Sequence, residues 1–169
     1  MKGIPCGLGD EQPVFSVYIA NRPPLDEYQQ LQTMRPLLPG EVAGIARQTG
    51  NHWRKIFNVY AKLAFALDNR GFESWQAYRD GILLQAGSGQ ALLFSLPDLP
   101  SPGVHLITGK TYAQALPLNA RLTVLDSSFQ ADARRSLFVT PYFDYRQLNN
   151  EKIIRLVAMI RALGSGREL

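Results

Sequence analysis

Val104–Leu116, VHLITGKTYAQAL, contains in one short stretch the pattern that decides the fold. The four residues Val104–Ile107 predict a short buried strand, with one histidine inside it. A Gly-Lys turn follows, and Thr108–Leu116 then predicts a short helix that Pro117 ends. A short apolar strand followed at once by a helix is typical of a parallel sheet that helices cover.

The same alternation extends outward along the chain in both directions. Further strands are predicted where β-branched, aromatic and leucine side chains gather: Pro13–Ala20, Gln90–Leu96, Arg121–Leu125 and Ser136–Thr140. Ile82–Gln85 fits either a strand or the last turn of a helix. Apolar residues at helical spacing predict helices over Leu25–Met34, Gly40–Gly50, Asn51–Leu67 and Glu73–Asp80, and from a cap at Asn149 or Asn150 to Leu163. We therefore expect a single α/β domain over residues 1–169, with three α/β/α layers and a mostly parallel central sheet of four to five strands.

Composition narrows the class of protein without naming a function. Among 169 residues, 18 Lys and Arg outnumber 14 Asp and Glu, so the formal net charge is +4. This balance permits a nucleic-acid partner but does not require one. The hydrophobic fraction of 46% excludes global disorder, and a single cysteine, Cys6, excludes a disulfide scaffold. We expect a cytoplasmic protein with no membrane partner, because no apolar run reaches the length of a signal peptide or membrane span.

Motifs for metals, cofactors and nucleotide hydrolysis are missing from the sequence. His52 and His105 lie far apart and no cysteine pair accompanies them, so no metal site is expected. Gly109-Lys110-Thr111 follows a predicted strand as a P-loop would, but five residues separate Gly103 from Gly109 where that motif needs four. We therefore expect no cofactor.

Polar side chains follow three of the predicted strands where each strand ends. Asn21 and Arg22 follow the first, Gly109 and Lys110 a middle one, and residues 141–146 (PYFDYR) the last. Ligands of open α/β sheets bind beyond the carboxyl ends of the strands, so these loops are expected to form one cleft. Each residue alone also has an ordinary explanation, such as a satisfied turn at Asn21 or a solvated amine at Lys110.

Together these stretches resemble the uracil-DNA glycosylase superfamily, closest to its mismatch-specific and thymine-DNA glycosylase branch. Val104–Leu116 resembles the strand, Gly-Lys turn and short helix of that family, and Leu137–Leu163 resembles its last strand, active-site loop and terminal helix. Val14–Leu25 (VFSVYIANRPPL) stands where the family has its first strand and water-positioning loop. Asn51–Tyr60 (NHWRKIFNVY) is similar to its Asn-Arg-Phe-Trp helix start. The resemblance implies the family's fold and hydrolysis of the N-glycosidic bond of a flipped DNA base.

The resemblance also assigns roles to residues of this chain. Asn21 is the expected catalytic residue, which would hold the attacking water. Residues expected to contact the substrate are Arg22, Tyr142, Phe143, Asp144 and Tyr145. Basic residues expected to contact phosphates of double-stranded DNA are Lys110, Arg134, Arg135, Arg146 and Lys152.

Two motifs depart from the family pattern and leave alternatives open. Residues 20–24 read Ala-Asn-Arg-Pro-Pro where the family has Gly-x-Asn-Pro-Gly. No histidine follows the last strand, where the family places a polar group against the leaving base. One alternative is a DNA-binding module that kept the fold without the chemistry. The other is a domain that binds a small ligand or a protein.

Overall fold

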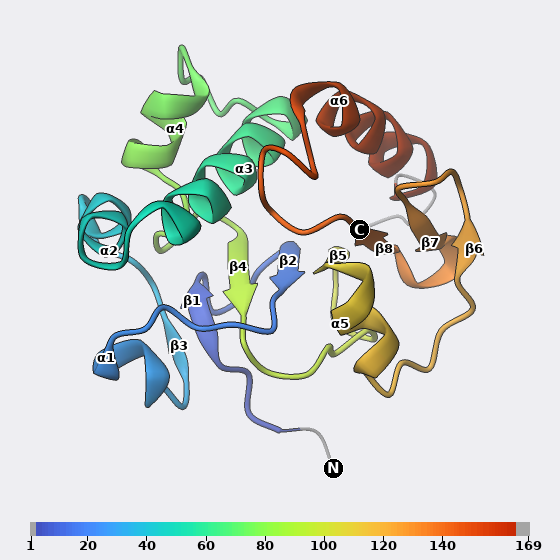
Figure 1. The fold of residues 1–169 in the computed structure, drawn as a ribbon, viewed down its shortest axis with the longest axis horizontal. Helices are drawn as coiled ribbons and strands as arrows, with labels where there is room; N and C mark the ends of the chain where they lie inside the picture. Colours follow the sequence, from blue (N-terminus) through green and yellow to red (C-terminus); the bar gives the residue numbers. More distant parts are fainter. Residues whose placement is uncertain (1–2, 165–169) are drawn as a thin grey trace.

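The computed structural model of the chain describes residues 3–164, which form one mixed α/β structure around an eight-stranded sheet (Figure 1). From one edge of the sheet to the other, the strands are β3 (Met34–Arg35), β1 (Gly7–Gly9), β4 (Gln90–Leu93), β2 (Phe15–Tyr18), β5 (Val104–Thr108), β8 (Leu137–Thr140), β7 (Gln130–Asp132) and β6 (Thr123–Val124). The four central strands β4, β2, β5 and β8 are all parallel. Antiparallel pairs occur only toward the edges, between β1 and β4, β8 and β7, and β7 and β6. The prediction of a mostly parallel sheet is thus confirmed.

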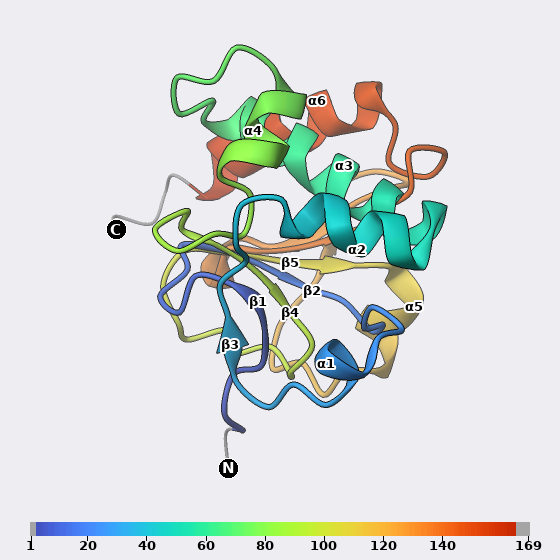
Figure 2. The ribbon, with the colours of Figure 1, turned by 90° about the vertical axis from the view of Figure 1, so that its left-hand side faces the viewer.

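Six α-helices lie on the two sides of this sheet. They are α1 (Asp26–Gln29), α2 (Glu41–Thr49), α3 (Asn51–Leu67), α4 (Trp75–Gly81), α5 (Lys110–Ala115) and α6 (Asn150–Met159). Figure 2 shows α2, α3, α4 and α6 on one side of the sheet and α1 and α5 on the other. None of the helices within residues 3–164 combines the length and hydropathy that a membrane crossing requires. Residues 1–2 and 165–169, the ends of the predicted domain, lie outside the described residues.

The predicted sheet of four to five strands was too small. All five firmly predicted strands are present, and β1, β3 and β7 are additional. These three carry no alternating apolar pattern, because they are two or three residues long and contain glycine or polar side chains. Position 7 in β1 requires glycine, because a Cβ there would collide with the Leu92 carbonyl oxygen on β4.

The predicted helix over Leu25–Met34 is also wrong, because α1 has a single turn and Met34 belongs to β3. The Arg22 guanidinium donates hydrogen bonds to the backbone carbonyls of Tyr28, Gln29 and Leu31, at 2.9, 3.0 and 2.8 Å. A continuing helix would use such carbonyls for its own ladder. The arginine therefore takes the place of the next helical turn.

The main core lies between the sheet and the larger helical layer. The apolar stripe predicted on α3 is buried there, and it includes Trp53, Ile56, Phe57 and Tyr60. The Tyr60 hydroxyl donates to the Ala91 carbonyl of β4 at 2.9 Å, so α3 is tied to the sheet as well as packed on it. A smaller core under α5 contains side chains from β2, β5 and β8. The strand ends between α3 and α5 are thereby held in place from both sides.

Helix caps explain where two of the helices begin. The Asn149 side chain accepts a hydrogen bond from the Lys152 backbone N–H at 2.9 Å, which confirms one of the two predicted caps of α6. At α3 the cap is Gly50, whereas Asn51 lies inside the helix and accepts from the Arg54 side chain at 2.8 Å.

Candidate functional site at the carboxyl ends of the central strands

The carboxyl ends of β2, β5 and β8 lie side by side. Tyr18 pairs with Ile107 in register, and Thr108 pairs with Thr140. The three loops that leave these ends meet at an open pocket of about 800 Å³, which we call the rim pocket. Its lining includes Ala20, Lys110 and Tyr142, one residue from each loop. The predicted convergence of the three loops is confirmed.

The turn at Gly109 sets one wall of the rim pocket. Gly109 has φ +105°, a conformation that side chains disfavour, and α5 begins at the next residue. Its N–H donates to the Thr140 carbonyl at 2.9 Å. The Thr108 hydroxyl accepts from the Phe143 N–H at 2.9 Å. These two bonds fasten the loop after β8 to the end of β5, so the two walls cannot separate.

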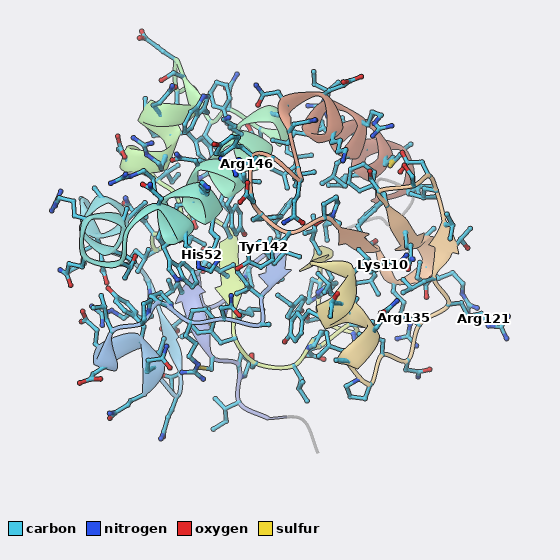
Figure 3. All side chains as sticks on the ribbon, in the orientation of Figure 1. His52, Lys110, Arg121, Arg135, Tyr142 and Arg146 are labelled. Carbon is cyan, nitrogen blue, oxygen red and sulfur yellow. The ribbon has the colours of Figure 1, made fainter. Side chains whose placement is uncertain are left out.

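Three cations line the rim pocket: Lys110, Arg146 and Lys152, here called the rim cations. Figure 3 labels Lys110 and Arg146 together with Tyr142. Among the described residues, no Asp or Glu lines the pocket. Within residues 3–164 none of the three forms an ion pair, although the Lys152 ammonium donates to the Gln147 carbonyl at 3.1 Å. The pocket therefore carries uncompensated positive charge, which attracts anions.

Tyr142 stands at the centre of the rim and is held by two distant residues. The Asn21 Nδ2 group donates to its hydroxyl at 3.0 Å, and His52 Nε2 lies 2.9 Å from the same oxygen. The His52 and Tyr142 rings are 5.8 Å apart between centroids. Burial raises the pKa of the Tyr142 phenol above its ordinary value, so it is protonated at neutral pH. The ring is thus presented to the pocket in a fixed orientation.

His52 is the rim residue that sequence reasoning missed. It comes from the first turn of α3, and its sequence position showed only that it lies off the apolar stripe. Its partner Tyr142 is ninety residues away. The sole local signal was its place at a predicted helix start, which says nothing about the loop that packs beside it.

Asn21 lies beside the rim pocket rather than in its lining, and it reaches the pocket through the Tyr142 hydroxyl. The side chain is exposed. Asn21, Lys110 and Tyr142 are therefore gathered at one rim, as expected. The catalytic role of Asn21 stays a prediction.

Two residues expected to contact a substrate have structural positions instead. The Arg22 guanidinium binds the carbonyls at the end of α1 and lies 5.2 Å from the Phe94 ring centroid. Phe143 is fully buried and packs edge-on against Tyr60, with centroids 5.9 Å apart. The prediction of a substrate contact for Phe143 is thus wrong, because its side chain is fully buried in the core. The substrate contact of Arg22 stays a prediction.

Asp144 and Tyr145 shape the loop without lining the pocket. Asp144 Oδ1 accepts from the Arg146 N–H at 2.8 Å, and its Oδ2 lies 3.8 Å from the Lys55 ammonium. Tyr145 is 48% exposed, and the Lys55 ammonium stands 5.1 Å from its ring centroid. Asp144 orders the turn that carries Arg146, and Tyr145 covers its outer side.

The remaining predicted basic residues, Arg134 and Arg135, lie at the opposite end of β8. They belong to the short 3-10 helix Ala133–Arg135, which precedes the strand, whereas the rim loop follows it. With Arg121 they line another pocket, of about 300 Å³, which we call the far-end pocket. Arg121, Arg134 and Arg135 are called the far-end arginines. Arg134 and Arg135 therefore do not share one edge with Arg146 and Lys152, because β8 separates the two groups. Contact of Arg134 and Arg135 with DNA phosphates stays a prediction.

The donor set decides what the rim pocket can hold. Residues 3–164 contain no group of three or more His, Cys, Asp or Glu side chains placed to bind a metal ion. The rim pocket instead offers ammonium and guanidinium groups beside two aromatic rings, those of Tyr112 and Tyr142. Such a set fits a phosphate oxygen together with a planar ring.

Comparison with known proteins identifies a family for the chain but gives no function. No curated protein matches the chain, and no solved structure matches it. A family model described as "Family of unknown function (DUF6942)" matches residues 6–161, which is most of the chain and includes the whole rim. The chain therefore belongs to the DUF6942 family.

Proposed function

We propose that the chain binds DNA at the rim pocket and holds one extrahelical base against Tyr142. The observation that carries this proposal is the single pocket that unites the rim cations with an aromatic ring and has no carboxylate in its lining. Lysine and arginine side chains contact phosphates, which supply most of the affinity for DNA. A flipped base then stacks on an aromatic ring, and every base has a face suited to such stacking.

Two further features support this function. The pocket volume of about 800 Å³ falls within the range of pockets that enclose small organic groups. The strand-loop-helix stretches resemble the uracil-DNA glycosylase superfamily, a resemblance that implies a base-binding loop at residues 141–146. The contacts of the Tyr142 hydroxyl with Asn21 and His52 hold the Tyr142 ring in place at the pocket wall.

A binding assay with labelled duplexes tests this proposal. We would measure fluorescence anisotropy for a paired duplex and for one with a single unpaired nucleotide, across a potassium chloride series. Three phosphate contacts predict that log Kd rises with log salt with a slope of about 2.7. Tyr142→Ala should lower the preference for the duplex with the unpaired nucleotide about tenfold and leave the salt slope of Kd unchanged. Tyr145→Ala, in the same loop but outside the lining, is the matched control.

Two results would contradict the binding role. One is the absence of binding at the lowest salt concentration. The other is an affinity that does not change with salt, because contact with phosphates requires release of counterions.

Hydrolysis of the N-glycosidic bond of that base is the second candidate, and the geometry of Asn21 favours it. Its Nδ2 group donates to the Tyr142 hydroxyl, so its Oδ1 is the atom that would accept from a water. In the reaction, the water oxygen forms a bond to the sugar C1′ while the bond from C1′ to the base nitrogen breaks. The water loses a proton and the departing base takes one up. Asn21 would orient the water, since a neutral amide cannot take its proton.

A glycosylase assay separates hydrolysis from binding. Duplexes with uracil, thymine in a mismatch, or hypoxanthine would be incubated with excess protein, and abasic sites detected by alkaline cleavage. We expect product with the native chain, loss of product with Asn21→Ala, and retained DNA affinity in that variant. No abasic product from any duplex would refute hydrolysis and leave the binding role to the anisotropy assay.

A further inference from the structure

The two aromatic rings of the rim pocket come from two different walls. Tyr142 lines the pocket from the loop after β8. Tyr112 lies on α5 and lines the pocket together with Thr111 and Ala115 of the same helix. A ligand that enters the pocket can therefore meet a flat apolar surface on each of two walls.

The two rings do not contact each other. In the described part of the chain the Tyr142 ring contacts the His52 ring, and Tyr112 forms no ring contact. The Tyr142 ring lies beside the turn at Gly109, where an added Cβ would be 3.7 Å from its Cδ1 atom. Tyr112 follows Gly109 by three residues, which is about 4.5 Å along the axis of a helix. The rings thus provide two separate stacking surfaces.

The Tyr112 side chain is held by packing and not by its hydroxyl, which has no hydrogen-bond partner among residues 3–164. The buried tyrosines differ, because each places its hydroxyl on a partner: Tyr18, Tyr28, Tyr60 and Tyr78. Tyr112 is half-buried and packs against the smaller core under α5. Burial raises the pKa of its phenol above the ordinary value, so the side chain is neutral at neutral pH and does not repel phosphates.

The charge and the size of the rim pocket fit two nucleotides better than one. A strand carries one phosphate between neighbouring nucleotides, so two consecutive nucleotides are bounded by three phosphates, and the pocket has three rim cations. The volume of about 800 Å³ lies in the upper part of the range for pockets that enclose drug-sized molecules, and a single base is smaller than such a molecule. The other polar lining residues are uncharged: Thr108, Thr111, Ser127, Ser128 and Gln147.

We propose that the rim pocket takes two consecutive unpaired nucleotides, with one base stacked on Tyr142 and the other on Tyr112. The inference rests on the proposed binding of DNA at the rim and names its substrate class, which is duplex DNA with a short unpaired segment in one strand. The rim cations contact the phosphates between and on both sides of the two nucleotides. Every base has a face that stacks on an aromatic ring, so the segment is recognised by its length and not by its sequence.

Duplexes with zero, one, two or three unpaired thymidines in one strand test the inference by fluorescence anisotropy at a fixed salt concentration. We expect Kd to fall about tenfold from zero to one unpaired nucleotide and about tenfold again from one to two. A third unpaired nucleotide should change Kd by less than about twofold, because the described lining contains two rings. An abasic analogue at one of two unpaired positions should raise Kd about tenfold, since one ring then has no base to stack on.

Variants at position 112 separate stacking from folding. Tyr112→Leu removes the flat ring and keeps an apolar side chain against the smaller core, and melting temperatures check that the fold is kept. It should abolish the step in Kd from one to two unpaired nucleotides and retain the step from zero to one. Tyr112→Phe keeps the ring and should retain both steps. Tyr145→Leu, in the rim loop but outside the pocket lining, is the matched control and should also retain both.

The inference is overturned if two unpaired nucleotides bind no more tightly than one, or if Tyr112→Leu retains that step. It is also overturned if Tyr112→Phe or Tyr145→Leu abolishes the step, because the effect then does not come from the Tyr112 ring. Each of these results leaves the step from zero to one unpaired nucleotide, and with it the proposed function, intact. Absence of the step from zero to one, or of DNA binding altogether, refutes the proposed function and the inference together.

Discussion

The rim pocket and the far-end pocket lie at the two ends of β8, and each contains three cations. They differ in what accompanies the charge. The rim pocket has Tyr142 and no carboxylate in its lining, whereas the far-end pocket has no aromatic residue and contains the buried carboxylate of Asp132. That carboxylate accepts from the Arg121 N–H at 2.9 Å and the Arg134 N–H at 3.1 Å. The rim cations thus lie in a lining without a carboxylate, whereas at the far end a carboxylate holds the backbone of the segments that carry the arginines.

The largest expected effect concerns how deeply the rim loop enters the core. Phe143→Ala should lower the free energy of unfolding by about 3–5 kcal/mol, because it empties a fully buried ring position against Tyr60. Tyr145→Ala, at a half-exposed position two residues later, should lower it by less than about 1 kcal/mol. Urea denaturation of both variants measures the difference. Similar losses in the two variants would mean that the loop is not anchored through Phe143.

Removing charge tests the two ends against each other directly. Replacing all three rim cations by alanine should weaken DNA binding about 100-fold at low salt and flatten its salt dependence, since about three phosphate contacts are lost. The same replacement of the far-end arginines should weaken binding less than about threefold. Anisotropy titrations, with melting temperatures as a check on folding, provide the measurement. If the two triple variants behave alike, the difference between the ends has no functional meaning.

The carboxylates at the two ends should differ in their contribution to stability. Asp132→Ala should lower the free energy of unfolding by about 2 kcal/mol, because two backbone N–H groups lose a charged acceptor at a site that is 7% exposed. Asp144→Ala should lower it by about 1 kcal/mol, since its carboxylate accepts one backbone N–H and lies nearer to solvent. Chemical denaturation is the readout, and a larger effect at Asp144 would reverse the roles inferred for the two ends.

The smallest expected effect is the coupling within the rim itself. In a double-mutant cycle, His52→Ala and Tyr142→Phe should show an interaction of about 0.5 kcal/mol in the free energy of unfolding. The contact that carries this coupling is the 2.9 Å approach of His52 Nε2 to the Tyr142 hydroxyl at an exposed position. His52→Ala combined with Tyr145→Phe is the control and should be additive. Additivity in both cycles would mean that His52 and Tyr142 do not interact.

Part of the site was open to prediction from the sequence because it depends on neighbours along the chain. The strand from Val104, the turn at Gly109 and the helix that follows were predicted from apolar spacing and one glycine, and the structure confirms their order. The separation of Arg134 and Arg135 from the rim also had a sequence signal. Both precede the last central strand, while the rim loop follows it.

Other features had no local signal. Phe143 belongs to an aromatic run in which Tyr142 faces the pocket and Phe143 enters the core, and only the packing of Tyr60 distinguishes them. Arg22 binds carbonyls six to nine residues away, but no spacing rule predicts where a guanidinium folds back. The short strands β1 and β3 carry no side-chain pattern, and they pair with their neighbours through backbone groups.

By itself the sequence determined the alternation of strands and helices, the parallel centre of the sheet and the loops that leave the strand ends. Periodicity and turn chemistry act over about ten residues, so these features could be deduced without coordinates. Only the tertiary structure decided that Asn21, His52 and Tyr142 meet and that the basic residues divide between two ends of β8. The partners in the rim contacts are separated by 90 to 121 residues, and such contacts depend on how whole layers pack.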